Sequence, residues 1–261
     1  MRFLLYNIAY GAGAGARLHF PFPFAGHLKS TGKNLGNILD FIQSVAPDIV
    51  GLVEVDSGSF RSGRDNQAEI IADQLDYHHV FESKYFERSV VQRLPVLNKQ
   101  GNAMLLNKNV RYTRFHYLSV GVKRLVIEVG LSDVVVFLVH LSLKYRHRQY
   151  QLAELYALIR AADRPVIVAG DFNTFWGSKE LQLFLAAANL KTANGQGEPS
   201  YPSRSPKKQL DFIFHSPEIQ TTGFEIPPVR LSDHAPLIWD FEVAAAEEDW
   251  APRLWAAGGS R

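Results

Sequence analysis

Four continuous apolar runs constrain the fold of this chain more than any other feature of its sequence. They read RFLLY, DIVGLVEV, VVVFLV and PVIVA, without a regular alternation of apolar and polar residues. Such runs are typical of strands buried on both faces, because a strand with one solvated face alternates with a period of two. We therefore expect each of these strands to lie in a sheet that is covered on both sides.

Four other segments have the period of a helix with one apolar face. Their apolar residues span 35–42, 68–75, 152–159 and 181–188, and Asp65 and Ser178 stand where N-caps of the second and fourth helix are expected. Further strands are predicted over residues 102–107, 124–129, 210–214 and 235–241. Strands interleaved with one-faced helices predict an α/β or α+β fold.

The composition excludes several kinds of chemistry. The 261 residues contain no cysteine, which excludes disulfides, thiolate metal ligands and cysteine nucleophiles. A formal net charge of +2 argues against a general nucleic-acid coat protein but leaves local basic patches open.

The start MRFLLYNIAYG is too short and polar for a signal peptide or membrane span, and no later segment reaches spanning length. We therefore expect a cytoplasmic protein.

Polar side chains stand where the predicted strands begin or end. Four strands end in Asn7, Glu54, His140 and Asp171, whereas two later strands follow directly on Asp211 and on the pair Asp233-His234. If the later strands run antiparallel to the first four, all these side chains meet at one rim. Each alone has an ordinary structural explanation, such as an Asx-turn formed by Asp171 and Asn173 or a buried core histidine. Their joint placement favours a functional site.

The composition of this set indicates its chemistry. Four carboxylates, those of Glu54, Asp171, Asp211 and Asp233, cannot all ionise side by side without a counter-charge. Oxygen ligands without thiolates favour a hard divalent cation, Mg²⁺ or Mn²⁺. The remaining acids could activate water, and the histidines could stabilise a phosphoryl oxygen. Metal-assisted hydrolysis of a phosphate ester uses every member of the set.

Six segments in this order, GLVEVD, GNAMLL, VHLSLKYRHRQYQL, AGDFN, QLDFIFHSP and LSDHAPL, resemble the endonuclease/exonuclease/phosphatase superfamily, which has the deoxyribonuclease-I-like fold. The resemblance implies a four-layer sandwich, in which two packed mixed β-sheets are flanked by helices on both outer faces. It spans roughly residues 1–243, which implies one catalytic domain followed by a C-terminal tail over 244–261.

The resemblance also implies a role for each residue that matches a motif. Metal binding falls to Glu54, Asn7 and Asp233. Catalysis falls to His140, Asp171, Asn173, Asp211 and His234. Asp171 would orient or deprotonate the attacking water and Asn173 would hold the phosphate or that water. His234, hydrogen-bonded to Asp211, would stabilise charge on the phosphoryl oxygen, and His140 would bind the phosphate from the other side. The number of metal ions and the identity of the base stay open.

Three residues are candidates for substrate binding: Asn102 in GNAMLL, Arg146 in the basic stretch KYRHRQ, and Trp176 beyond the GDFN turn. Arg146 and the basic segment 204–208 could contact phosphates or could be solvated loop charges. Trp176 could stack on substrate, although core packing is the commoner role of a tryptophan. The Phe-rich segment 19–27 could contact lipid or pack on the body of the protein.

These observations predict a monomeric Mg²⁺- or Mn²⁺-dependent phosphohydrolase, with a phosphodiesterase acting on a lipid-linked or small-molecule phosphate as the first hypothesis. Residues 140–142 read HLS where abasic-site endonucleases carry a tyrosine and a Pro-Asn motif, and KKQLDFIF lacks the motif of inositol-polyphosphate 5-phosphatases. A nuclease is the second hypothesis. A binding protein that has kept the fold without the chemistry is the third.

Overall fold

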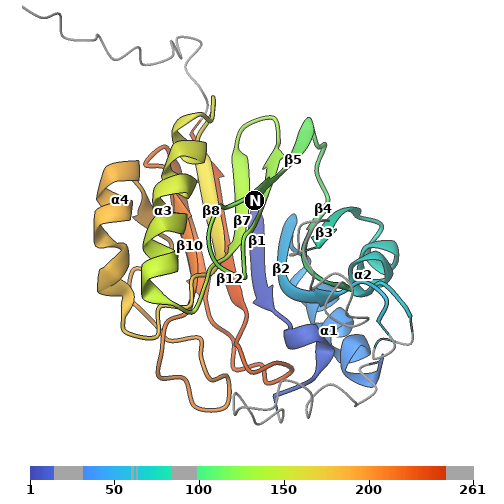
Figure 1. Ribbon diagram of the computed structural model, residues 1–261. Helices are drawn as coiled ribbons and strands as arrows, with labels where there is room; N and C mark the ends of the chain where they lie inside the picture. The colour runs from blue at the N-terminus through green and yellow to red at the C-terminus, as the bar shows by residue number, and fades with distance from the viewer. Residues whose placement is uncertain (15–31, 60–61, 63, 84–98, 245–261) are drawn as a thin grey trace, which may run out of the picture.

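The computed structural model describes residues 1–14, 32–59, 62, 64–83 and 99–244. Within these residues, two six-stranded sheets pack face to face and four helices cover their outer faces (Figure 1). The four-layer sandwich implied by the resemblance is therefore confirmed. None of the described helices is long and apolar enough to cross a membrane.

The first sheet has the strand order β11-β12-β1-β2-β4-β3. Its strands are β1 (Arg2–Asn7), β2 (Ile49–Asp56), β3 (His78–Ser83), β4 (Gln100–Leu106), β11 (Ile219–Glu225) and β12 (Leu237–Val243). The central pair β1 and β2 is parallel, and the other neighbours are antiparallel.

The second sheet repeats this plan with the order β5-β6-β7-β8-β10-β9. Its strands are β5 (Tyr112–Tyr117), β6 (Leu125–Gly130), β7 (Val135–His140), β8 (Val166–Asp171), β9 (Lys191–Thr192) and β10 (Asp211–His215). Here the parallel pair is β7 and β8. The sequence did not predict β3, β5, β9 and β11, and these four strands form the edges of the two sheets.

Helices α1 (Gly32–Val45) and α2 (Gln67–Leu75) lie on the first sheet, and α3 (Tyr145–Arg160) and α4 (Gln182–Ala188) lie on the second (Figure 1). Short 3₁₀ turns span η1 (Ala9–Gly11) and η5 (Ser178–Leu181). The predicted N-caps were wrong by a short distance. Asn66, not Asp65, caps α2 by accepting a hydrogen bond from the Ala68 N–H, and Ser178 begins η5 rather than capping α4.

The apolar runs are continuous because every central strand contributes to two cores. In β7, Val136 and Leu138 face the other sheet, whereas Val135, Phe137 and Val139 face α3 and its neighbours. All five side chains are fully buried. Burying a side chain of this size stabilises the fold by roughly 1.5–3 kcal/mol. Neither face of a central strand can therefore carry a solvated residue.

Strand direction brings the predicted site residues to one rim. The carboxyl ends of the two parallel pairs carry Asn7, Glu54, His140 and Asp171. Strand β10 runs antiparallel to β8 with Asp211 opposite Asp171, and β12 runs antiparallel to β1. The prediction that the late strands run antiparallel to the early ones is confirmed, and the start of each late strand lies beside the end of an early one.

Candidate active site

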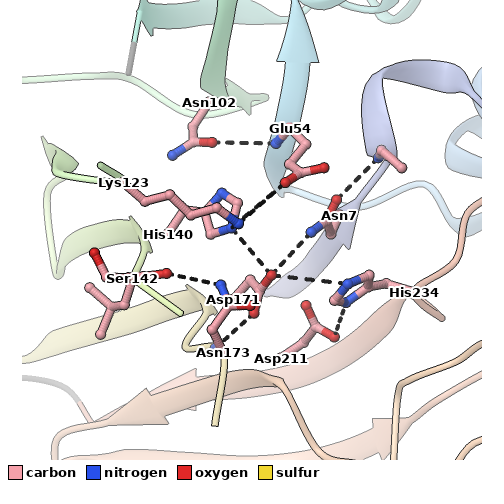
Figure 2. A network of polar contacts seen from close by, with 12 residues as sticks. Asn7, Glu54, Asn102, Lys123, His140, Ser142, Asp171, Asn173, Asp211 and His234 are labelled. Carbon is pink, nitrogen blue, oxygen red and sulfur yellow. Dashed lines mark hydrogen bonds and ion pairs between the residues drawn. The ribbon is translucent and has the colours of Figure 1, made fainter. Parts of the chain in front are cut away.

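Polar side chains from both sheets meet at this rim around the carboxylate of Asp171 (Figure 2). Its Oδ2 accepts a hydrogen bond from Asn7 Nδ2 at 3.2 Å and lies 3.3 Å from His140 Nε2 and 4.0 Å from His234 Nε2. All four side chains are buried. Burial raises the pKa of Asp171, but hydrogen bonding to His140 and the charges of His140, His234 and Lys123 hold it well below its usual range. Asp171 is therefore a buried carboxylate that stays ionised.

The turn after β8 explains why Asp171 and Asn173 stand two residues apart. Asp171 Oδ1 accepts a hydrogen bond of 2.9 Å from the Asn173 N–H, and Asn173 Nδ2 donates to the Leu141 carbonyl at 2.9 Å. Phe172 between them is fully buried and packs edge-on against Phe214. The Asx-turn is therefore confirmed, and while one carboxylate oxygen closes the turn, the other faces His140 and His234.

Asp211 and His234 form a buried hydrogen-bonded pair beside Asp171. His234 Nδ1 lies 2.7 Å from Asp211 Oδ2, which also accepts a 2.5 Å hydrogen bond from the Ser200 hydroxyl. Burial lowers the pKa of His234, but Asp211, by charge and hydrogen bond, and the charges of Asp171 and Asp233 raise it to about 10. Burial also raises the pKa of Asp211, against the opposing effect of His234. The pair thus presents a protonated imidazole whose Nε2 points toward Asp171.

Glu54 reaches the rim because β2 contains an irregularity there. Leu52 pairs with Ala103 and Val55 with Gly101, so two residues of β2 oppose one of β4. Such a bulge redirects a side chain, and Glu54 has φ +58, a conformation uncommon for residues other than glycine. Its N–H donates to Asn102 Oδ1 at 3.3 Å. Asn102 therefore lies beside Glu54, and its Nδ2 is buried with no hydrogen-bond partner in the described structure.

The side of the site next to Glu54 also contains Lys123, which the sequence did not single out. Lys123 Nζ lies 3.4 Å from Glu54 Oε1 and makes a short contact with His140 Nε2. Burial and the Lys123 charge lower the pKa of His140 to about 4, against the opposing effects of Asp171 and Glu54. His140 is therefore neutral at pH 7 and the positive charge on this side belongs to Lys123.

Two groups of side chains could hold a metal ion. Glu54, with a 20% exposed side chain, is accessible and offers the oxygen donor that Mg²⁺ prefers. Asp171, Asp211 and His234 also place ligand atoms within 4.8 Å of one another. That group, however, includes an imidazole nitrogen, whereas Mg²⁺ prefers oxygen ligands. The oxygen donor of Glu54 thus fits a hard cation better than the Asp–Asp–His group does.

The remaining predicted residues differ in where they lie. Asp233 is half-buried next to His234, and its Oδ1 accepts a 3.2 Å hydrogen bond from the Ser232 hydroxyl. Arg146 is exposed in the first turn of α3 and makes none of the site's hydrogen bonds or ion pairs among the described residues. Trp176 is 86% exposed in the turn before η5, so the core-packing alternative was wrong. Residues 19–27 lie outside the described residues.

A buried Asp–His pair, an ionised aspartate and an accessible glutamate, joined across two packed sheets, define a phosphoesterase type of site on a deoxyribonuclease-I-like sandwich. Residues 5–234 match the family model described as "Endonuclease/Exonuclease/phosphatase family". The chain belongs to this family and is a phosphoric ester hydrolase. Enzymes of the family generally depend on a divalent metal and act on phosphate-ester substrates.

Individual proteins are similar to this chain in sequence or in fold. The uncharacterized protein YbhP of Escherichia coli strain K12 is 28% identical over 229 residues, covering 78% of this chain and 86% of that protein. An endonuclease/exonuclease/phosphatase from Beutenbergia cavernae DSM 12333 superposes with a TM-score of 0.71 at 21% identity, covering 94% of this chain and 72% of that one. The human Nocturnin catalytic domain with bound sulfate anion has a TM-score of 0.66 at 22% identity, covering 94% of each chain.

Proposed function

We propose that the protein is a Mg²⁺-dependent phosphohydrolase in which water attacks the phosphorus of a small-molecule or lipid-linked phosphate ester in line with the leaving group. One observation carries this proposal: the ionised Asp171 carboxylate lies between His140 and His234, with Nε2 distances of 3.3 and 4.0 Å to one oxygen. The base, which is the Asp171 carboxylate, and the charged acid, which is protonated His234, thereby lie together at the rim where Glu54 is accessible.

Each side chain has a defined task in this mechanism. Asp171 Oδ2 accepts the proton of the attacking water, since this carboxylate stays ionised at neutral pH. Protonated His234 donates its Nε2–H to a phosphoryl oxygen, and Asp211 maintains that protonation through the 2.7 Å hydrogen bond. Asn7, which donates to Asp171, orients the carboxylate.

Glu54 would hold the cation, with Asn7 and Asp233 as the further candidate ligands. A divalent ion bound there supplies Lewis-acid stabilisation of charge that develops on the phosphate oxygens. The bulge that redirects Glu54 and the hydrogen bond from its N–H to Asn102 hold the ligand in place. In this proposal Asn102 therefore supports the metal ligand Glu54. Direct contact between Asn102 and the substrate stays a prediction.

Hydrolysis of small-molecule or lipid-linked esters is the first candidate because a net charge of +2 gives no support for binding to extended nucleic acid. Trp176, 86% exposed in the turn that follows Asn173, is the candidate platform for an apolar or aromatic leaving group. Contact of residues 19–27 with lipid stays a prediction. A nuclease is the alternative that a plasmid-cleavage assay tests directly.

The test measures hydrolysis of bis(4-nitrophenyl) phosphate and 4-nitrophenyl phosphate with Mg²⁺, with Mn²⁺ and with EDTA. We expect EDTA to abolish activity and the variants Glu54→Gln, Asp171→Asn and His234→Gln each to lose roughly 10²–10⁴-fold in kcat. Asp240→Asn is the matched control, because Asp240 forms a surface ion pair with Arg2, at the opposite end of β1 from Asn7. Calorimetric titration with Mn²⁺ should show weaker binding to Glu54→Gln than to the control. Full activity in EDTA would refute the proposal.

A further inference from the structure

Lys123 is a charged residue of the site to which neither the sequence motifs nor the mechanism above gives a role. It precedes β6, and its side chain is only 19% exposed. Figure 2 shows its ammonium group between Glu54 and His140, and Nζ lies 3.4 Å from Glu54 Oε1. A lysine normally extends its charged end into solvent. Here the charged end points into the rim instead.

The segment 118–124 that carries Lys123 is fastened to α3 by buried hydrogen bonds. Gln151, which is fully buried, donates from Nε2 to the carbonyls of Val120 at 2.9 Å and Lys123 at 2.6 Å. Its Oε1 accepts a 2.9 Å hydrogen bond from the Ser142 N–H, two residues after His140. One side chain thus fixes the Lys123 backbone relative to the strand that carries His140.

A glycine allows the same segment to lie close to the end of β7. Gly121 has φ +92, and a Cβ built there would lie 2.1 Å from Ser142 Oγ. A side chain at this position would therefore be strained by the positive φ and would push the Ser142 hydroxyl aside. The backbone conformation and the Gln151 contacts act together, so the position of Lys123 is built into the fold rather than left to a flexible loop.

Two further side chains, those of Asn102 and His140, belong to this side of the site. Asn102 Nδ2 is buried and has no hydrogen-bond partner in the described structure, and the N–H of Glu54 holds the other end of this amide. His140 Nε2 also contacts Lys123. Glu54 is the carboxylate that would take up a cation, which would remove the ion-pair partner of Lys123. An ammonium group fixed there would then be available to an anion.

We propose that Lys123 is a substrate-binding residue that contacts the non-bridging oxygens of the phosphate and makes the site prefer a phosphomonoester over a phosphodiester. A monoester phosphate carries close to two negative charges at pH 8, whereas a diester carries one and replaces a charged oxygen with an ester group. An additional fixed cation beside His140 therefore favours the monoester. This inference rests on the proposed function and departs from the phosphodiesterase that the sequence favoured.

The variants Lys123→Met and Lys123→Arg test the role of the charge, and Lys191→Met is the matched control. Lys191 lies on β9 opposite His215, at the end of β10 remote from Asp211. Kinetics with 4-nitrophenyl phosphate and bis(4-nitrophenyl) phosphate are measured at pH 8, and inorganic phosphate binding is measured by calorimetry. We expect Lys123→Met to raise KM for the monoester and Kd for phosphate at least about tenfold, and KM for the diester less than about threefold. Lys123→Arg should recover part of the loss.

Gln151→Glu tests the positioning of the lysine, because a carboxylate cannot donate to the carbonyls of Val120 and Lys123. It should raise the monoester KM with a smaller effect on kcat. Combining it with Lys123→Met should add no further loss in KM, since both changes remove the same contact. A merely structural role for Gln151 would instead lower kcat for both substrates and add to the effect of Lys123→Met.

Unchanged phosphate binding by Lys123→Met would overturn the inference, and so would an equal rise in KM for the monoester and the diester. If the wild-type protein hydrolyses neither ester, the proposed function fails while phosphate binding still decides the role of Lys123. Absence of phosphate binding by the wild-type protein, with and without Mg²⁺, would also overturn it.

Discussion

Replacing Arg148 with methionine should destabilise the protein far more than replacing a surface arginine. The Arg148 side chain is fully buried in α3 and forms three hydrogen bonds, at 2.7, 2.8 and 3.2 Å, with the carboxylate of Glu180. Its Nη1 also donates to the carbonyls of Ser142 at 2.8 Å and Leu143 at 2.9 Å. One guanidinium thus connects the segment after His140 to η5, on the side of the site where Trp176 lies.

The magnitude follows from what Arg148→Met leaves behind. The Glu180 side chain is 7% exposed, so its carboxylate would stay buried without a partner, together with two carbonyl groups. Breaking a buried ion pair in this way costs about 3–5 kcal/mol. The control pair Arg2–Asp240 has side chains that are 43% and 35% exposed, and its loss should cost less than about 1 kcal/mol.

Urea denaturation followed by tryptophan fluorescence measures the difference. With a denaturant slope near 3 kcal/mol per molar, the midpoint of Arg148→Met should fall by roughly 1–1.7 M, and that of Arg2→Met by less than about 0.3 M. The double variant Arg148→Met/Glu180→Leu should regain part of the loss, because no unpaired charge remains. Equal midpoints for Arg148→Met and Arg2→Met would refute the reasoning.

Two further predictions concern the chemistry of the site. In Asp211→Asn the largest of the charges that raise the pKa of His234 is lost, while burial, which lowers this pKa, and the charges of Asp171 and Asp233, which raise it, remain. The alkaline limb of the pH–rate profile, which follows loss of the His234 proton, should therefore move to lower pH, and an unmoved limb would contradict the assigned role. Trp176→Ala should change stability by less than about 0.5 kcal/mol, because Trp176 is 86% exposed, but should raise KM for aryl phosphates. An unchanged KM would exclude Trp176 as a platform.

The central part of the fold could be predicted from the sequence because burial on both faces leaves a local signal. Every strand predicted from an apolar run exists, and these strands form the interior of the two sheets. The four missed strands are the sheet edges, where solvent reaches the side chains and the apolar run is lost. In β5, for example, none of the six residues is buried. The apolar faces of the helices were predicted for the same reason. N-caps depend on a hydrogen bond that several neighbouring residues can make, and in α2 the residue that makes it is Asn66 rather than Asp65.

The chemistry of the site was predictable to a similar extent. Asn7, Glu54, His140, Asp171 and Asp211 interrupt or terminate apolar runs, so their types and positions are visible in the chain. Their convergence depended on strand direction, which the pairing of β10 with β8 and of β12 with β1 provides, and for Glu54 also on the bulge in β2. Arg146 was singled out from the same basic stretch as Arg148, but the exposed arginine and the buried one differ only in the helix face they occupy.

What the sequence determined by itself was therefore the layered fold and the residue types at its rim, since both follow from patterns of burial along single strands. Only the tertiary structure decided how those residues are supported and charged. The bulge that redirects Glu54 arises from register between β2 and β4, and the placement of Lys123 depends on Gln151, 28 residues away in the chain. Such contacts join groups distant in sequence and leave no periodic signal. Every residue has a backbone carbonyl, so a hydrogen bond to that carbonyl does not restrict the type of the residue.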